Sequence, residues 1–242
     1  MRPSEIFGRA LDKALDRAPP RLAAGIDLRR PMLWDSWGGP FNGQRGRQAM
    51  LRDLVGLCGF TEIVETGTFR GVTTQFLSDI SGSPVHSCEL FARYFRFSSV
   101  RLASRDIELE NMDSRAFLLQ LASRLDSVTG PVLFYLDAHW REDLPLAEEL
   151  RIIAPRWPKS VVLVDDFQVA DDPGYVYDDY GPGKVLNESL IPVECLDEWA
   201  VAYPSLPSRD ETGFRTGCCV LIGPPMISVA RQSAHLRITR TL

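Results

Sequence analysis

From Glu62 onward, short apolar runs alternate with stretches of helical periodicity, and this alternation constrains the fold more than any other feature of the sequence. Strands that alternate with helices of this length form βαβ units around a parallel sheet. Right-handed crossovers bring the C-terminal ends of such strands to one edge, where open α/β sheets bind their ligands. The apolar runs lie at 62–65, 85–88, 106–110, 132–136 and 161–164, and the helical patterns lie near 72–80, 91–103, 114–125 and 144–154.

Two further strand candidates follow the fifth apolar run, near 200–203 and 217–222. The segment between them is too short to hold a long crossover helix, so we expect them to pair as an antiparallel hairpin. The chain is therefore predicted to be an α/β protein with a Rossmann-like, doubly wound, seven-stranded sheet. That sheet is mainly parallel and ends in a C-terminal antiparallel edge hairpin.

The N-terminal part of the chain does not share this alternation. Apolar side chains at helical spacing predict a helix over about 3–18, which a Pro-Pro pair would end, and a second helix is predicted over 47–57. The Gly-rich loop between the two helices carries Trp34 and Trp37. These indoles either stack on an acceptor or, as is more usual, pack against the core.

At 242 residues, the chain suits one large α/β domain with a sizeable core. We interpret residues 1–58 as an N-terminal helical or lid segment packed on the core and residues 59–242 as the main domain. The two parts would form a single domain overall, because no linker divides them.

Composition excludes several classes of protein. The net charge of −5 argues against a protein that mainly neutralises phosphates, so we expect no nucleic-acid partner. No apolar stretch of about 18 residues occurs, so we expect no membrane span, and the charged N-terminus predicts no signal peptide. The five cysteines show no CxxC spacing and are interpreted as reduced, buried thiols of a cytoplasmic protein.

The first motif runs from Glu65 to Gly71 (ETGTFRG), between a predicted strand and a predicted helix. Gly67 and Gly71 would let the backbone turn tightly and approach a ligand closely. The motif lacks the opening Gly-x-Gly of the dinucleotide fingerprint, which disfavours NAD as the ligand. A glycine-containing turn of this kind is weak evidence when taken alone.

The ends of the next two strands add context to this turn. Glu89 lies 18 residues beyond Gly71, where a carboxylate can accept hydrogen bonds from both hydroxyls of a ribose. Asp113 and Ser114 follow the third strand, where they would cap a helix, contact an adenine edge, or do both. The ordered set predicts a nucleoside site.

Carboxylates also end the fourth and fifth strands. Asp137 follows the fourth strand, and Asp165 and Asp166 follow the fifth strand 28 residues later. On neighbouring strands, these three groups would converge and repel one another unless they bound a cation such as Mg²⁺. The stretch 137–211 carries a local net charge of −11, from 17 acidic and 6 basic residues. The alternative is a set of carboxylates at strand ends that meets only solvent.

The runs IVETGTFRGVTT, VHSCE and NMDS together resemble the cofactor-binding segments of class I S-adenosylmethionine-dependent methyltransferases. The resemblance covers roughly residues 60–223, including the edge hairpin. It implies S-adenosylmethionine as the methyl donor and assigns residues to each part of it. The methionine part would face Glu65, Thr66, Gly67 and Thr68, the ribose would face Glu89, and the adenine would face Asp113 and Ser114.

The Asp…Asp-Asp layout is similar to that of metal-dependent O-methyltransferases, both the catechol type and the type that methylates macrolide sugar hydroxyls. LDAHW is closer to the sugar type, and Trp140 stands where the catechol type has a lysine. The resemblance implies that Asp137, Asp165 and Asp166 hold the metal. His139 is our candidate general base, because a neutral imidazole can take a proton from a hydroxyl. The alternatives for this histidine are a structural role, a contact to one of the metal ligands, or direct binding of the metal.

The predicted activity is therefore metal-assisted transfer of a methyl group from S-adenosylmethionine to a hydroxyl of a small molecule or saccharide. Catalytic roles are assigned to His139 and Asp137, and a homo-oligomer is left open. Three alternatives are a metal-dependent hydroxylase on a similar fold, an inactive partner subunit that keeps only the nucleoside pocket, and an NAD-dependent reductase.

Overall fold

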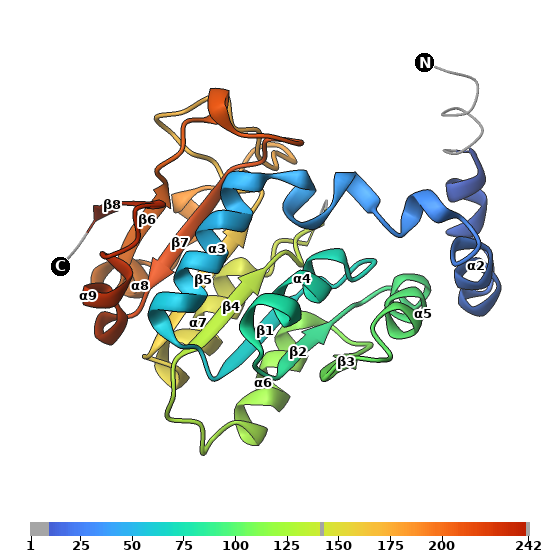
Figure 1. The fold of residues 1–242 in the computed structure, drawn as a ribbon, viewed down its shortest axis with the longest axis horizontal. Helices are drawn as coiled ribbons and strands as arrows, with labels where there is room; N and C mark the ends of the chain where they lie inside the picture. Colours follow the sequence, from blue (N-terminus) through green and yellow to red (C-terminus); the bar gives the residue numbers. More distant parts are fainter. Residues whose placement is uncertain (1–9, 141–142, 241–242) are drawn as a thin grey trace.

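The computed structural model describes residues 10–140 and 143–240, which form a central sheet covered by helices on both faces (Figure 1). The strand order is β3-β2-β1-β4-β5-β7-β6-β8, with β1 to β5 parallel and the remaining strands antiparallel to their neighbours. The predicted fold class is confirmed. The strands are β1 (Glu62–Thr66), β2 (Val85–Cys88), β3 (Ile107–Glu110), β4 (Val132–Leu136), β5 (Ser160–Asp165), β6 (Ala200–Pro204), β7 (Cys218–Ile222) and β8 (Leu236–Arg240).

The sheet has eight strands, so the predicted number of seven was wrong. The additional strand, β8, pairs antiparallel with β6, so β6 and β7 form the predicted hairpin but do not form the edge. The run from Leu236 to Arg240 alternates apolar and polar side chains, and both Leu236 and Ile238 pack against the core. This alternation was a readable strand signal.

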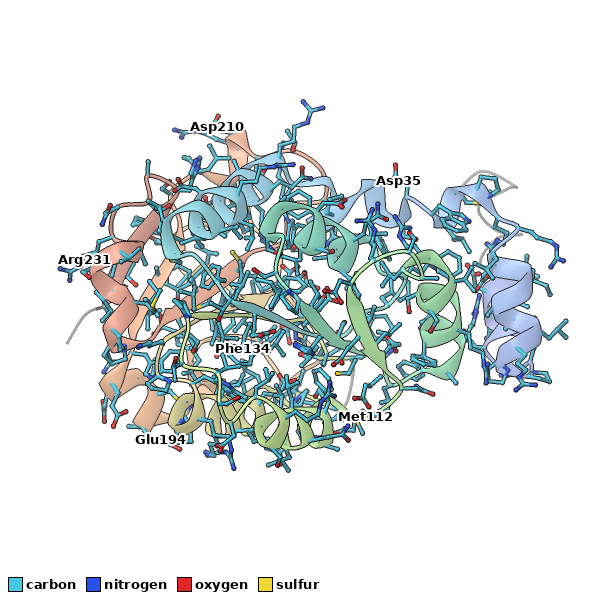
Figure 2. All side chains as sticks on the ribbon, turned by 60° about the horizontal axis from the view of Figure 1, so that its bottom comes forward. Asp35, Met112, Phe134, Glu194, Asp210 and Arg231 are labelled. Carbon is cyan, nitrogen blue, oxygen red and sulfur yellow. The ribbon has the colours of Figure 1, made fainter. Side chains whose placement is uncertain are left out.

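Two helical layers cover the sheet, and each has its own apolar core. Helices α3, α4 and α9 pack on one face, and α6, α7 and α8 pack on the other. Figure 2 shows side chains filling the space between the layers, with Phe134 of β4 in the interior. The helices are α2 (Pro20–Asp27), α3 (Arg45–Cys58), α4 (Val72–Ser81), α5 (Ala92–Arg101), α6 (Ser114–Arg124), α7 (Leu146–Arg156), α8 (Val193–Glu198) and α9 (Ile227–Ala230).

Short 3₁₀ turns join several of these elements. They are η1 (Pro31–Leu33), η2 (Ser36–Gly38), η3 (Pro40–Gly43), η4 (Glu188–Leu190), η5 (Ser208–Asp210) and η6 (Pro224–Met226). The first three connect α2 to α3, across the loop that the sequence marks as Gly-rich. The predicted helices of the βαβ region match α4 to α7 within a few residues.

The N-terminal part lies beside the β3 edge of the domain in Figure 1, and its helix α2 contacts α5. Residues 10–15 are helical, and the first part of the helix predicted over 3–18 lies outside the described residues. Pro20 begins α2, because proline lacks only an N–H that the first turn leaves unpaired anyway. Both Asp27 oxygens accept from the Arg93 guanidinium of α5, at 2.9 and 2.7 Å, in a buried pair that joins the two helices. The division of the chain at residue 58 stays a prediction.

The helix α3 begins where a carboxylate from the far end of the chain meets it. The backbone N–H groups of Gly46 and Arg47 donate to the Glu211 carboxylate at 2.9 and 3.1 Å. An anion at a helix N-terminus satisfies unpaired donors and opposes the positive end of the helix dipole. This contact fixes the start of α3 over the C-terminal end of β5 and the N-terminal end of β7.

The strand order reverses between β1 and β4, because the chain runs outward from β1 to β3 and then returns to β4 on the other side of β1. In doubly wound sheets, ligands bind at such a reversal, outside the C-terminal ends of the strands. Three of the residues predicted to bind a nucleoside or a cation are the last residues of strands: Glu65 and Thr66 end β1, and Asp165 ends β5. The others follow the C-terminal ends of strands β1 to β5.

All five cysteines are buried and unpaired, as predicted. Among the helices that the structure describes, none combines the length and apolar character that a membrane crossing needs.

Candidate functional site

The loop after β1 lies directly against the residue that follows β4. The Asp137 N–H donates to the Thr66 carbonyl at 2.9 Å, which extends the pairing of the two strands. Gly67 has φ of 90°, and a Cβ at this position would overlap the carbonyl oxygen of Asp137. Only glycine satisfies both requirements. The predicted cofactor loop and the predicted metal residue are therefore a single packed unit.

Buried hydroxyl groups hold this loop in place through a series of hydrogen bonds. The Glu65 carboxylate accepts from the hydroxyls of Thr74 and Ser87 at 2.5 and 2.6 Å, and Ser87 also contacts the Thr68 hydroxyl at 2.6 Å. Burial raises the pKa of Glu65 to about 7, against the opposing effect of these hydrogen bonds. Ser87 and Thr74 were not predicted as site residues, although a serine inside the apolar run VHSC was a signal.

Glu89 follows β2, as predicted, and its carboxylate closes two turns of backbone. Its two oxygens accept from the N–H groups of Phe69 and Phe91, both at 2.7 Å. Burial raises the pKa of this carboxyl, and the two backbone donors oppose that rise. Each oxygen keeps a second lone pair, so the carboxylate can still accept from a ribose hydroxyl.

Asp113 is the N-cap of α6. Its side chain accepts from the backbone N–H groups of Arg115 and Ala116, at 2.9 and 3.5 Å, and pairs with the Arg115 guanidinium at 2.7 Å. The arginine lowers the pKa of Asp113. The capping role expected for this residue is therefore observed, and Ser114 beside it is buried.

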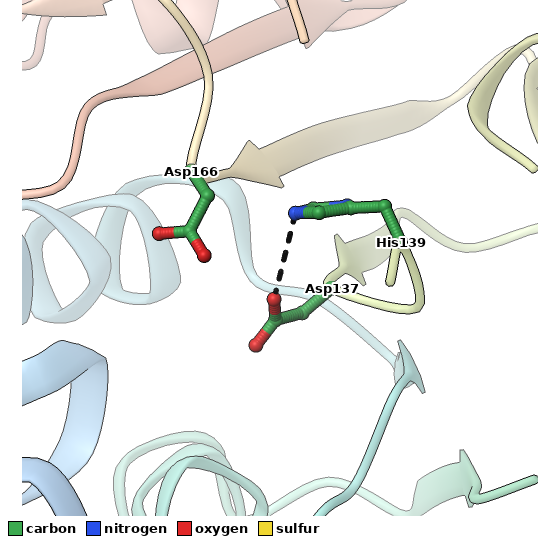
Figure 3. Close-up of side chains that lie close together, drawn as sticks. All are labelled: Asp137, His139 and Asp166. Atoms are coloured by element: carbon green, nitrogen blue, oxygen red, sulfur yellow. Dashed lines mark ion pairs between the residues drawn. The ribbon is translucent and has the colours of Figure 1, made fainter. Parts of the chain in front are cut away.

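Asp137, His139 and Asp166 form the Asp-His-Asp cluster at the ends of β4 and β5 (Figure 3). Each residue offers one ligand atom, and these atoms all lie within 4.8 Å of one another. The Nε2 atom of His139 is 3.8 Å from Oδ1 of Asp137, too far for a hydrogen bond. Neither this nitrogen nor Oδ1 of Asp166 has a hydrogen-bond partner among the described residues, although both are buried. Buried polar atoms of this kind are satisfied by an ordered water, an ion or a ligand.

The electrostatics of the cluster also favour a bound cation. Desolvation and the neighbouring carboxylates of Asp165 and Asp166 raise the pKa of Asp137 well above its usual range. The same two causes, burial and Asp165, raise the pKa of Asp166 to about 8. Burial lowers the pKa of His139, which keeps its imidazole neutral. Carboxylates that repel one another beside a neutral imidazole are a suitable donor set for a cation.

The backbone at Asp166 is strained. Its φ is 49°, a left-handed conformation that is uncommon for residues other than glycine. Its N–H donates to Oδ1 of Asp165 at 2.8 Å, which helps to hold the turn. This conformation directs the Asp166 side chain toward Asp137 and His139 (Figure 3). Strain of this kind concentrates at functional sites.

The third predicted metal carboxylate is not a member of the cluster. Asp165 makes a buried ion pair with Arg47 of α3, and its other oxygen accepts from the Tyr135 hydroxyl. The three carboxylates do lie near one another, as expected, since both Asp165 and Asp166 act on the pKa of Asp137. The assignment of Asp165 as a metal ligand stays a prediction. Arg47 was not predicted as a site residue, because it is 118 positions away in the sequence and belongs to an apparently ordinary amphipathic helix.

The Gly/Tyr loop after β5 supplies one further group. Oδ2 of Asp178 is 3.9 Å from Nε2 of His139 and accepts from the Tyr180 hydroxyl at 2.5 Å. The Asp178 N–H donates to the Asp166 carbonyl at 2.9 Å, which anchors the loop. Tyr175 of the same loop lies in the apolar core.

The remaining aromatic and histidine candidates lie outside this cluster. The Trp34 ring packs on Phe97 at 5.5 Å, in keeping with a packing role, whereas Trp37 is 67% exposed. His86 is buried between Glu62 and Glu108, with ring nitrogens 3.0 and 2.9 Å from their carboxylates. It belongs to the interior of the sheet.

No model of a known protein family matches the chain, and no curated protein matches it. Solved structures do match. The O-methyltransferase TomG from Streptomyces achromogenes, in complex with SAM, is similar over 73% of this chain and 79% of its own, with 18% identity and a TM-score of 0.51. Cofactor-bound Rv0187 from MTB is similar over 92% of this chain and 98% of its own, with 14% identity and a TM-score of 0.50. The chain therefore has the fold of class I S-adenosylmethionine-dependent methyltransferases.

Proposed function

We propose that this protein is an S-adenosylmethionine-dependent O-methyltransferase that acts on a hydroxyl group of a small molecule or saccharide. One observation carries the proposal: the Gly67 turn of the cofactor loop packs directly against Asp137 of the Asp-His-Asp cluster. A methyl donor in the loop would then lie beside the groups that handle the acceptor. TomG, which shares the fold, is described as an O-methyltransferase in complex with SAM.

The polar groups of the cofactor half suit the parts of the donor. Glu89 would accept from the ribose hydroxyls, because its oxygens keep lone pairs after binding two backbone N–H groups. The turn formed by Glu65, Thr66, Gly67 and Thr68, together with Gly71, would face the methionine part. Asp113 and Ser114 at the start of α6 would contact the adenine, as the resemblance implies.

The cluster fits a divalent cation, because it holds two carboxylates and a neutral imidazole with unpartnered buried atoms. Asp137 and Asp166 are the carboxylates that would hold it, and Mg²⁺ is the ion expected for carboxylates alone. When bound, such a cation supplies electrophilic stabilisation of an acceptor oxygen. Asp165 would keep its ion pair with Arg47.

The reaction forms an O–CH₃ bond as the S–CH₃ bond breaks, leaving S-adenosylhomocysteine and releasing the hydroxyl proton. Two groups can accept that proton, the Nε2 atom of His139 in the cluster and the Asp178 carboxylate beside it. Most of the rate enhancement would come from holding donor and acceptor in line and excluding water.

Calorimetry and a turnover assay test this proposal. We expect the purified chain to bind S-adenosylmethionine and S-adenosylhomocysteine, and to transfer a labelled methyl group to at least one member of a panel of polyols, sugars and phenols. Cofactor binding without any transfer would favour the inactive-partner alternative. Oxygen consumption without methyl transfer would favour the hydroxylase alternative.

The five unpaired cysteines fit a reducing compartment, so we also propose a cytoplasmic location.

A further inference from the structure

Asp165 is fully engaged by protein groups. Its Oδ1 atom accepts from Arg47 and from the Asp166 N–H, and its Oδ2 atom accepts from the Tyr135 hydroxyl. The side chains of Arg47 and Asp165 are 1% and 3% exposed, so water cannot replace either partner. Arg47 also donates to the Thr216 carbonyl, which fixes the guanidinium from a second side.

Freeing Asp165 to bind a cation would leave the Arg47 guanidinium buried and without its counter-charge. Removing one partner from a buried ion pair is strongly destabilising, because the remaining charge cannot be solvated. The electrostatic balance of the site therefore keeps Asp165 on Arg47.

Unlike Asp165, His139 keeps a ligand atom that no group of the described residues engages. Only 6% of the residue is exposed, its Nε2 atom has no hydrogen-bond partner among the described residues, and the ring points at the carboxylates of Asp137 and Asp166 (Figure 3). A buried imidazole nitrogen aimed at two carboxylates is placed as a ligand.

We propose that, in the enzyme proposed above, the protein ligands of the cation are Asp137, His139 and Asp166, and that Asp165 is a positioning residue. Asp165 acts through Arg47 and Tyr135, and through its hydrogen bond to the Asp166 N–H it holds the strained turn that presents Asp166. The N-terminal segment, which carries Arg47, thereby takes part in building the site.

The ligand types select the class of metal. Mg²⁺ prefers oxygen ligands and water, whereas imidazole suits first-row transition metals. One nitrogen and two carboxylates therefore favour Mn²⁺ and ions of its series over Mg²⁺. The same assignment occupies Nε2 of His139, so this atom is no longer available to accept the hydroxyl proton.

Electron paramagnetic resonance of Mn²⁺ added to the full, chelator-treated chain tests the ligand set without any turnover. Pulsed spectra should show coupling to a nitrogen nucleus in the wild type. His139→Gln should lose that coupling and weaken Mn²⁺ binding by about tenfold or more. His235→Gln, which changes a histidine outside the site, should match the wild type.

Asp165→Asn should keep the nitrogen coupling and lose less affinity than His139→Gln. Because this change leaves Arg47 unpaired and can destabilise the fold, the double variant Arg47→Gln/Asp165→Asn is measured beside it, with circular dichroism as the check on folding. A folded double variant that retains the nitrogen coupling supports the assignment.

Three results would overturn the inference. Bound Mn²⁺ without nitrogen coupling would remove His139 from the ligand set and leave the proposed methyl transfer intact. Tighter binding of Mg²⁺ than of Mn²⁺ would refute the metal class. Failure to bind either ion at millimolar concentration would refute the cation altogether, and calorimetry with S-adenosylmethionine would then show separately whether the donor site of the proposed function stands.

Discussion

The two halves of the C-terminal sheet edge differ in how completely their polar groups are satisfied. At the ends of β1, β2 and β3, Glu65, Glu89 and Asp113 all accept hydrogen bonds from neighbouring hydroxyl or N–H groups. At the ends of β4 and β5, buried atoms of His139 and Asp166 have no such partner in the described chain, and the backbone of Asp166 is strained.

This difference separates two kinds of site. The cofactor half is preorganised by its own hydrogen bonds, so it should keep its shape with or without a ligand. The cluster half carries desolvated groups that repel one another, and its most favourable state includes a cation. Changes in the first half should therefore alter donor binding and stability, and changes in the second half should alter turnover.

The largest effect is expected at the junction of the two halves. Gly67→Ala places a Cβ against the Asp137 carbonyl at a residue with φ of 90°, so it should cost on the order of 3 kcal/mol of stability and abolish donor binding. Urea denaturation and calorimetry measure both. Gly56→Ala, at an open position in α3, should instead leave the fold intact or stabilise it slightly. If Gly67→Ala bound the donor and resisted urea as well as Gly56→Ala does, the Gly67 turn would not be the junction of the two halves.

Removing a cluster carboxylate should separate chemistry from binding. Asp137→Ala is expected to lower kcat roughly 100-fold or more, since several kcal/mol of transition-state stabilisation are lost. The affinity for S-adenosylhomocysteine should stay within a small factor, and chelation should have the same effect on the wild type. Asp171→Ala, which alters an exposed carboxylate paired with Arg237, is the control. Full activity in the chelator would remove the cation from the proposal.

The pH dependence of stability should report the buried carboxyl of the cofactor half. Folded Glu65 keeps its proton up to a pKa of about 7, whereas in the unfolded chain it loses the proton near its usual value of 4.5. Stability is therefore lost as pH rises through this window, by on the order of 3 kcal/mol. Denaturation at several pH values should show this loss in the wild type and a smaller one in Glu65→Gln. Identical slopes for the two proteins would contradict the assignment.

The smallest expected effect concerns the ribose contact. Glu89→Gln keeps one acceptor oxygen and leaves one of the two backbone N–H groups without its acceptor, so donor affinity should fall about tenfold and stability should fall by about 1 kcal/mol. Calorimetry with S-adenosylhomocysteine measures this fall. Glu110→Gln, at the end of β3 where the carboxylate pairs with Arg124, should bind the donor as the wild type does.

Much of the fold could be predicted because its determinants are local. Alternating apolar runs and helical patterns are written in short windows of sequence, and parallel βαβ units leave few arrangements open. The parallel arrangement of the first five strands then followed, together with the placement of Glu89, Asp137 and Asp166 at one sheet edge. The strand β8 was missed even though Leu236 and Ile238 carried its alternation, because a short run near the chain end is a weak signal.

The amino-acid sequence alone indicates that a turn with Gly67 and a set of carboxylates meet at one edge of a doubly wound sheet. Only the tertiary structure decided which of those carboxylates remain available. Arg47 reaches Asp165 across 118 residues, and no local pattern records a pairing made by packing α3 over β5. Burial then makes that pairing durable, because neither charge can exchange its partner for water.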